Sequence, residues 1–166
     1  MEIRKLSSEY AVRHLGNEDV DIIFELSRHN HIFYQYHPPF VTRESILEDI
    51  GALPPNKDYT DKFYIGFFDG GTLIAVMDLI LDYPQENTAF IGLFMVDAAF
   101  QGRGTGSRII EECAEYLASL GYQKIRLGID EGNPQSDAFW RKNSFIKTGE
   151  EVPNDFSAYL LMERIL

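Results

Sequence analysis

The sequence VDAAFQGRGTGS, residues 96–107, connects two runs of opposite character. Before it, Ala89–Val96 is continuously apolar, which is typical of a central strand buried on both faces of a sheet. After it, Thr105–Leu120 places apolar residues on one helical stripe and acidic residues on the other, and Gly121 suits the C′ position that ends a helix. The pattern predicts a buried strand, a short turn and an amphipathic helix.

Three glycines, Gly102, Gly104 and Gly106, alternate through this turn. Glycine accepts positive φ and lets a ligand approach the backbone closely. The start of a helix carries N–H groups without intrahelical partners, at the positive end of the helix dipole. We therefore expect main-chain N–H groups here to hold a phosphate or pyrophosphate. A turn without a ligand is the alternative, and it is disfavoured because each glycine weakens local structure by about 0.5–1 kcal/mol relative to alanine.

The spacing excludes two nucleotide-binding motifs. A dinucleotide fingerprint, G-x-G-x-x-G, needs a third glycine where the chain has Ser107 or Ile109, depending on which glycine is counted first. A P-loop needs a lysine next to its last glycine, and no lysine occurs between Lys62 and Lys124. A dinucleotide-binding oxidoreductase and a P-loop protein are therefore not indicated.

Residues 101–106, QGRGTG, resemble the Q/R-x-x-G-x-G/A loop with which the GNAT superfamily of N-acetyltransferases grips the pyrophosphate of acetyl-CoA. Leu93–Val96 resembles the family's fourth strand, whose main chain runs beside the pantetheine arm. Asn133, Ala138–Trp140 and Phe145 resemble the second family block, N-x-x-A-x-x-(F/Y)-Y-x-K-x-G-F. The resemblance implies that acetyl-CoA is the co-substrate and that it contacts Phe94, Met95, Val96, Gln101, Gly102, Arg103, Gly104, Thr105, Gly106, Asn133, Phe139 and Trp140.

The chain departs from the family pattern at two positions of the second block. The usual tyrosine, which would protonate the departing thiolate, is Trp140, and the usual glycine is Ser144. An indole N–H donates a hydrogen bond but does not give up its proton. We expect Trp140 to pack against the cofactor arm, and a thiolate with a pKa near about 8.5 can leave without an acid.

The general base is not fixed by the resemblance. Many family members carry a glutamate on the fourth strand, but Ala89–Phe94 contains no carboxylate. Asp78, Asp97 and His31 are the candidates, because the aspartates follow or end strands and histidine titrates near neutral pH. His31 is one of three histidines, with His29 and His37, before the second predicted helix. A turn cap for the aspartates and a surface or packing role for the histidines remain the alternatives.

The aromatic run Ile32–Phe40 is predicted to form a wall or lid of the acceptor site, with His29, Phe33 and Tyr34 contacting the substrate; core packing is the alternative. No metal is expected, since residues two apart on a helix, such as His29 and His31, do not face each other. Cys113, the one cysteine, lies on the apolar helix stripe and is expected to be a buried thiol that forms no acyl-enzyme.

The order of elements along the rest of the chain predicts an α/β (α+β) fold, and the resemblance implies a GNAT-like single domain over residues 1–166. Its central mixed, mostly antiparallel sheet would be flanked by about four helices. The further expected strands are Ile3–Leu6, the hairpin of Phe63–Phe68 and Leu73–Leu81, Ile125–Ile129, Phe145–Thr148 and Tyr159–Met162; the further helices are Asp19–Arg28, Thr42–Leu53 and Pro134–Lys142 with Asn133 as N-cap.

Composition supports a globular protein, since 45% of the residues are hydrophobic and 25% are charged. The net charge of −11 argues against non-specific binding of nucleic acid or an anionic membrane. The N-terminus leads into no apolar signal segment and no run is long enough to span a membrane, so a cytoplasmic location is expected. Tyr159–Met162 with Ile165 and Leu166 would serve as the edge of a homodimer, or equally as a central core strand.

These observations predict an acetyl-CoA-dependent N-acetyltransferase. It would move an acetyl group to a primary amine of a small molecule or peptide, by direct attack in a ternary complex. The alternative is a non-catalytic acyl-CoA-binding sensor or regulatory module, which would carry the same glycine loop and the same fold.

Overall fold

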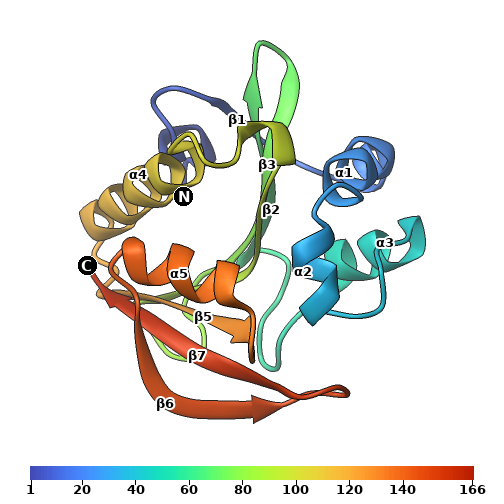
Figure 1. Ribbon diagram of the computed structural model, residues 1–166. Helices are drawn as coiled ribbons and strands as arrows, with labels where there is room; N and C mark the ends of the chain where they lie inside the picture. The colour runs from blue at the N-terminus through green and yellow to red at the C-terminus, as the bar shows by residue number, and fades with distance from the viewer.

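A computed structural model describes residues 1–166 as a seven-stranded sheet with helices on both faces (Figure 1). The strand order is β1-β2-β3-β4-β5-β7-β6, and only the β4–β5 pair is parallel. The strands are β1 (Ala11–His14), β2 (Lys62–Asp69), β3 (Thr72–Ile80), β4 (Thr88–Val96), β5 (Lys124–Asp130), β6 (Ile146–Pro153) and β7 (Ala158–Ile165). The helices are α1 (Val20–Ser27), α2 (His31–Tyr36), α3 (Arg43–Gly51), α4 (Thr105–Ser119) and α5 (Pro134–Lys142), with short 3-10 turns at Ile3–Leu6, Asn17–Asp19 and Ala98–Phe100.

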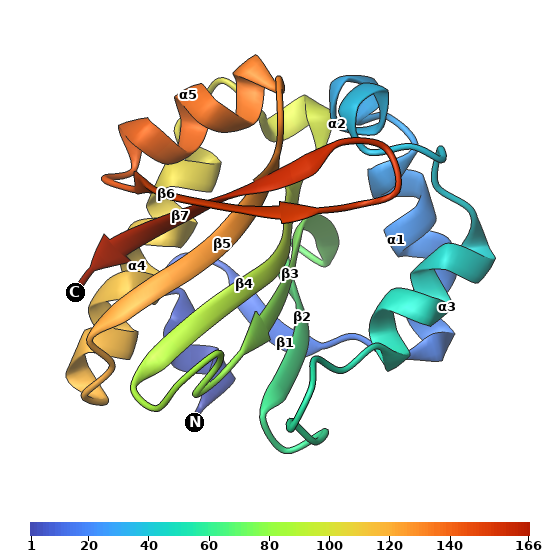
Figure 2. The same cartoon turned by 90° about the horizontal axis from the view of Figure 1, so that it is seen from below.

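The helices divide between the two faces of the sheet. Helices α4 and α5 lie on one side, and α1, α2 and α3 lie on the other (Figure 2). Each side has its own apolar cluster: the larger one contains the buried stripe of α4, and the smaller one packs α1 and α3 against the sheet. None of the helices is both long and apolar enough to cross a membrane.

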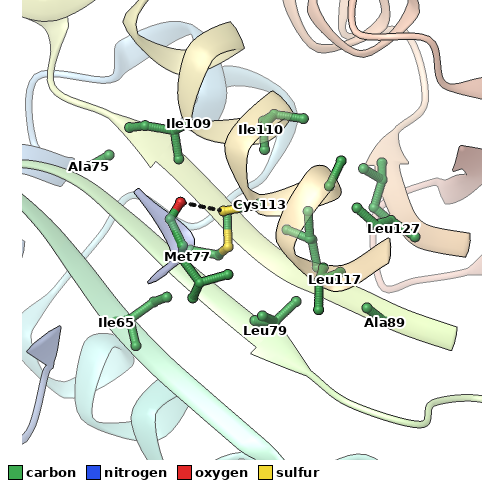
Figure 3. Close-up of a cluster of buried hydrophobic side chains, with 14 of the residues drawn as sticks. Ile65, Ala75, Met77, Leu79, Ala89, Ile109, Ile110, Cys113, Leu117 and Leu127 are labelled. Atoms are coloured by element: carbon green, nitrogen blue, oxygen red, sulfur yellow. Dashed lines mark hydrogen bonds between the residues drawn. The ribbon is translucent and has the colours of Figure 1, made fainter. Parts of the chain in front are cut away.

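The apolar stripe of α4 packs against the sheet and covers the larger cluster. Ile109, Ile110 and Leu117 are fully buried against side chains of the central strands, among them Met77 (Figure 3). Cys113 lies in the same stripe, 1% exposed, and its Sγ donates a long hydrogen bond of 3.5 Å to the carbonyl oxygen of Leu6. The predicted burial of this thiol is therefore confirmed, and burial raises its pKa.

The two halves of the sheet separate between β4 and β5. Their parallel ladder covers only Thr88–Ile91, paired with residues 124–127, after which the strands diverge. A register shift between β3 and β4 occurs at the same level, because Asp78 pairs with Leu93 while Leu79 pairs with Ile91. Gly92 is the extra residue, and such a bulge bends its strand.

The prediction that Ala89–Val96 is buried on both faces is therefore only half correct. Ala89 and Ile91 are buried, but Gly92 is exposed and Leu93 and Phe94 are half-buried. A continuous apolar run marks a strand covered on both faces. Here residues 92–94 are apolar but less covered because they border an opening between strands, whereas Met95 and Val96 are buried again.

The predicted fold class is confirmed: the sheet is mixed and mostly antiparallel, and helices flank it. The predicted helices at residues 19–28, 42–53, 105–120 and 134–142 all form, within a few residues of their expected ends. Thr42 caps α3, since its Oγ1 accepts from the N–H of Ser45 at 3.1 Å. Gly121 follows α4 with φ of +93°, which the C′ position requires.

Two expectations were wrong, and one open alternative was decided. Ile3–Leu6 forms a 3-10 turn rather than a strand, because apolar residues three apart share one face of such a turn and Leu6 is fully buried there. Helix α2 was not expected, since its aromatic and histidine content has low helix propensity. Strand β7 is no edge: it pairs with β5 on one side and with β6 on the other, so the alternative of a core strand is the one found.

Candidate functional site

A cavity of about 300 Å³ lies beside the glycine loop that precedes α4. Four segments build it: the end of β4, the loop with the first turn of α4, one face of α5, and the start of α2 with its N-cap. Aromatic side chains give it an apolar wall, and backbone groups of the loop give it a polar end. Its lining consists of Asn30, Phe33, Phe94, Met95, Val96, Gln101, Gly102, Gly104, Gly106, Ser107, Gln135, Ser136, Phe139, Trp140 and Lys142.

Glycine is required at the loop positions for two different reasons, the backbone conformation and the space available for a side chain. Gly102 and Gly104 have φ of +71° and +85°, and a Cβ at either position would meet no atom within 4 Å. Gly106 has ordinary helical φ, but a Cβ there would lie 3.1 Å from Phe139 and 3.2 Å from Val96. The first two positions need the left-handed conformation, whereas Gly106 lets α4 pack closely against β4 and α5.

The start of α4 is open to an anion. Gly104 is the N-cap and supplies no side chain to the first N–H groups of the helix, which also lack intrahelical partners. Lys142, from the last turn of α5, adds a cation to the same cavity. Donor N–H groups, a helix dipole and a cation form a cradle that suits a pyrophosphate, so the residues present fit the phosphate end of acetyl-CoA.

Gln101 shapes the loop through its side chain. Its Nε2 donates to the carbonyl oxygen of Val96 at 2.8 Å and to Oδ1 of Asn30 at 2.6 Å. Asn30 in turn donates to the carbonyl oxygen of Leu26 at the end of α1. Both Nε2 protons are thus engaged within the chain, and they connect the end of β4 to the segment between α1 and α2.

Three residues that the resemblance assigned to acetyl-CoA do not line the cavity: Arg103, Thr105 and Asn133. Thr105 is buried under the loop, and Asn133 is the N-cap of α5, accepting from the N–H groups of Gln135 and Ser136 at 3.1 Å. Asn133 therefore contributes indirectly, by orienting the helix whose next turns form the wall. Conversely, the sequence interpretation did not include Asn30, Ser107, Gln135, Ser136 or Lys142 in this wall.

A smaller cavity of about 60 Å³ continues into the opening between β4 and β5. Phe33, Phe94, Ser136 and Trp140 line both cavities, so the two cavities adjoin, and together they are called the channel below. The far end of this channel is bordered by Gly92 and Leu93 of β4 and by residues 127–130 of β5. The channel therefore runs from the phosphate cradle to the point where the two strands separate.

Trp140 stands where the two cavities meet. It is 7% exposed, and its ring packs at 4.9 Å from Phe145, 5.0 Å from Phe139 and 6.0 Å from Phe94, between ring centroids. These contacts make the indole a fixed wall of the channel. Since indole is not an acid at accessible pH, the side chain supplies shape there and no proton.

The aspartate candidates have structural partners. Asp97 caps the 3-10 turn after β4, its Oδ1 accepting from the N–H of Ala99 at 2.8 Å. Asp78 is buried and accepts from Nζ of Lys62 at 2.9 Å. Its Oδ2 would lie 3.0 Å from a Cβ at Gly92, which places the carboxylate just behind the channel's far end. Burial raises the pKa of Asp78, while the Lys62 ammonium opposes the rise.

Of the residues predicted to contact the acceptor, some line the channel and others do not. His29 and His31 are exposed, and His31 stacks on Phe40 at 5.9 Å, outside the channel lining. Phe33 lines both cavities. Tyr34 is half-buried and packs edge-on against Phe33 at 5.0 Å, and burial raises the pKa of Tyr34 to about 12. The aromatic run is thus part wall and part packing.

One pair near the channel had not been foreseen. Nδ1 of His37, directly after α2, lies 3.1 Å from Oδ1 of Asp130 at the end of β5. Asp130 lines the smaller cavity and is 8% exposed. The sequence pointed to His37 only as one of three histidines, and the sole signal for Asp130 was a carboxylate following a predicted strand.

The structure contains no group of three or more His, Cys, Asp or Glu side chains arranged to hold a metal ion.

Comparison with known proteins identifies the family. The chain matches the model of the acetyltransferase (GNAT) family over residues 21–145. L-2,4-diaminobutyric acid acetyltransferase of Nocardia farcinica (strain IFM 10152) is 27% identical over 103 residues, which cover 57% of this chain and 53% of that protein. The chain thus spans about half the length of this curated relative.

Solved structures share the fold. The PaiA N-acetyltransferase of Thermoplasma acidophilum in complex with coenzyme A has a TM-score of 0.68 at 20% identity, covering 95% of this chain and 99% of that one. An acetyltransferase of Thermus thermophilus has a TM-score of 0.71 at 19% identity, covering 95% and 97%. Because the family model covers well over half of its residues, the chain belongs to the acetyltransferase (GNAT) family.

Proposed function

We propose that this protein transfers the acetyl group of acetyl-CoA to a primary amine of a small molecule or peptide, by direct attack in a ternary complex. The observation that carries the proposal is the channel from the uncapped start of α4 to the separation of β4 and β5. One end suits a pyrophosphate and the other opens to the surface between two strands. A long acyl carrier and an amine would then meet from opposite ends.

Acetyl-CoA would be held mainly by backbone groups. The N–H groups of residues 102–107 would bind its pyrophosphate. Beyond Ile91 the edge of β4 that faces β5 has no strand partner, so the backbone of Phe94–Val96 is available to the pantetheine amides. When bound, acetyl-CoA supplies an activated thioester; N–H groups on this edge would stabilise charge on its carbonyl oxygen during attack.

The one thiol of the chain does not suit an acyl-enzyme. Cys113 is buried on the sheet-facing side of α4, and burial raises the pKa of its thiol. A thiol that stays protonated and enclosed is not a nucleophile. This supports direct transfer to the amine rather than a covalent intermediate.

Carboxylates surround the acceptor end of the channel, which supports a cationic amine as substrate. Asp130 lines the cavity, Asp78 lies behind Gly92, and Asp49 of α3 is close enough to affect His37. Burial raises the pKa of Asp49, and the negative charge of Asp78 raises it further. The relative from Nocardia farcinica is named for a diamino acid, which agrees with an acceptor that carries a second charged group.

The test is acetyl-CoA-dependent thiol release across a panel of amines, with a control lacking amine. The panel contains L-2,4-diaminobutyrate, spermidine, an aminoglycoside, free amino acids and a mixed peptide pool. We expect release that depends on one amine class, and the acetylated product identifies the acceptor by mass. Coenzyme A binding without release for any amine would contradict the proposed activity and favour a non-catalytic acyl-CoA-binding module.

Finer expectations belong to the same proposal. We infer a cytoplasmic protein that works without a metal ion and does not bind nucleic acid or membranes, in keeping with its net charge of −11. A homodimer formed by strand pairing would use β6 or β1, the two edges of the sheet. Strand β6 is exposed along nearly its whole length.

A further inference from the structure

His37 and Asp130 come together from segments 93 residues apart. His37 is the residue that ends α2, and Asp130 is the last residue of β5. Nδ1 of the imidazole lies 3.1 Å from Oδ1 and 3.2 Å from Oδ2 of the carboxylate. An ionised carboxylate only accepts hydrogen bonds, so Nδ1 carries the proton of this contact, and in the neutral imidazole Nε2 keeps its lone pair.

The imidazole is held in place by its surroundings. Its ring packs against Phe33 at 5.0 Å and stacks on Tyr159 of β7 at 6.1 Å, between ring centroids. Figure 2 shows the tip of the β6–β7 hairpin reaching across to α2, which brings β7 to this position. The side chain of His37 remains 39% exposed, whereas that of Asp130 is 9% exposed. Asp130, Phe33 and Tyr159 therefore fix the orientation of the imidazole, while the rest of the ring remains accessible to solvent.

The pair meets the acceptor end of the channel through Asp130, because His37 itself is not part of the lining of either cavity. Asp130 lines the cavity between β4 and β5, and Phe33, which contacts His37, lines both cavities. Among the other candidates, Asp97 caps a turn and His31 stacks outside the channel. Asp78 has a buried Oδ1 without a hydrogen-bond partner, but its carboxylate lies behind Gly92 and its Oδ2 is paired with the Lys62 ammonium.

We propose that His37 is the general base of the acetyl transfer and that Asp130 is its positioning residue. This inference rests on the proposed N-acetyltransferase function. Nε2 of His37 takes one proton from the acceptor ammonium or from its water, and the amine nitrogen forms the bond to the acetyl carbon. The carbon–sulfur bond breaks, the nitrogen releases its second surplus proton to solvent, and coenzyme A leaves as a thiolate that then takes a proton from solvent. Asp130 holds the tautomer that leaves Nε2 unprotonated.

The charges around His37 set the expected pH dependence. Asp130 of β5 and Asp49 of α3 are the acidic groups facing it, and Tyr159 of β7 is the further titratable neighbour. The hydrogen bond from Asp130 raises the pKa of His37 above its ordinary 6.5, although burial opposes the rise. Since the base must be neutral, kcat/KM should increase with pH through a break above 6.5.

The experiment compares His37→Gln and Asp130→Asn with the wild-type protein on the amine that supports turnover. His14→Gln is the matched control, because His14 is exposed on β1 and lies outside both cavities. We expect His37→Gln to lower kcat at pH 7 by about a hundredfold or more and to lose the break. The deficit should shrink toward alkaline pH, where the amine deprotonates unaided. Asp130→Asn should keep the break but move it to lower pH.

A second variant guards against a purely structural effect. His37→Ala should regain part of its activity when imidazole is added, and coenzyme A affinity should stay unchanged in every variant. Wild-type kcat and an unchanged pH profile in His37→Gln would overturn the inference and leave the proposed function intact. Absence of turnover by the wild-type protein on every amine would instead overturn the proposed function, and this inference with it.

Discussion

At the scale of single residues, glycine is required in the loop before α4 for two different reasons, backbone conformation and space. Gly104 is needed for its backbone, because its φ of +85° belongs to the left-handed region. Gly106 is needed for space, because a Cβ would press on Phe139 and Val96. Only the first constraint shapes the N–H groups that would face a phosphate, so the two positions should respond differently to substitution.

We predict that Gly104→Ala weakens coenzyme A binding. An alanine in the left-handed conformation is strained by about 1–2 kcal/mol, so the loop should relax and its N–H groups should turn away. Restoring them on binding would raise the Kd by about 5- to 30-fold, measured by titration calorimetry. Gly51→Ala is the control, since Gly51 is helical with open space around it and should leave the Kd unchanged. An unaltered Kd in Gly104→Ala would contradict the assigned role.

At the scale of elements, Lys62 joins three of them. Its Nζ donates to the carbonyl oxygens of Asp49 and Ala52 at the end of α3, both at 2.8 Å, and to Oδ2 of Asp78 on β3. The side chain is 3% exposed. A cation at the C-terminus of a helix satisfies carbonyls that have no intrahelical donor. Lys62 therefore fixes α3, and with it Asp49, against the central sheet.

Lys62→Met should lower the free energy of unfolding by about 3–5 kcal/mol at pH 7, because it leaves the buried Asp78 carboxylate without a counter-charge. Burial already raises the pKa of Asp78, and removing the ammonium raises it further. The deficit should therefore shrink as pH falls and Asp78 becomes protonated. Urea unfolding at pH 7 and pH 5 measures both effects.

The control for this change is Lys5→Met, which removes an exposed ion pair with Glu2. Such exposed pairs contribute little to stability, so this variant should unfold close to the wild type. A loss in Lys62→Met that is equally small, or that does not depend on pH, would show that the buried pair does not stabilise the attachment of α3.

At the scale of the whole molecule, the sheet consists of two halves joined by a short ladder. Strands β1–β4 form one half and β5–β7 the other, and their direct link is the four-residue pairing that starts at Thr88. The channel lies where this ladder stops, with walls from β4 on one side and β5 on the other. A ligand in the channel would therefore contact both halves and α5 together.

We predict that coenzyme A stabilises the folded protein against heat. At a ligand concentration 100 times its Kd, mass action adds about 2.7 kcal/mol. For a chain of this size the Tm should rise by about 5–10 °C, measured by differential scanning fluorimetry. NAD at the same concentration is the control and should give no shift, since the glycine spacing does not fit a dinucleotide. No shift with coenzyme A, or an equal shift with NAD, would contradict the assignment of the cavity.

The sequence alone determined the elements whose signals are local. The stripe of α4, the N-cap Asn133 and the glycines before α4 act within one or two turns, so the predicted helices and the loop between β4 and α4 agree with the structure. Helix α2 was not predicted because its residues have low helix propensity. Ring contacts of Phe33 with Tyr34 and His37 stabilise this segment in the folded protein.

Only the tertiary structure decided what lies across the sheet. The separation of β4 from β5 depends on a bulge at Gly92 and on packing from both halves, which no short window of sequence contains. Asp78 pairs with Lys62, 16 residues away, and Asp130 with His37, 93 residues away. The sequence around an aspartate therefore does not indicate whether its partner is a lysine or a histidine. Local preference specifies conformation, whereas side-chain chemistry depends on neighbours that only folding brings together.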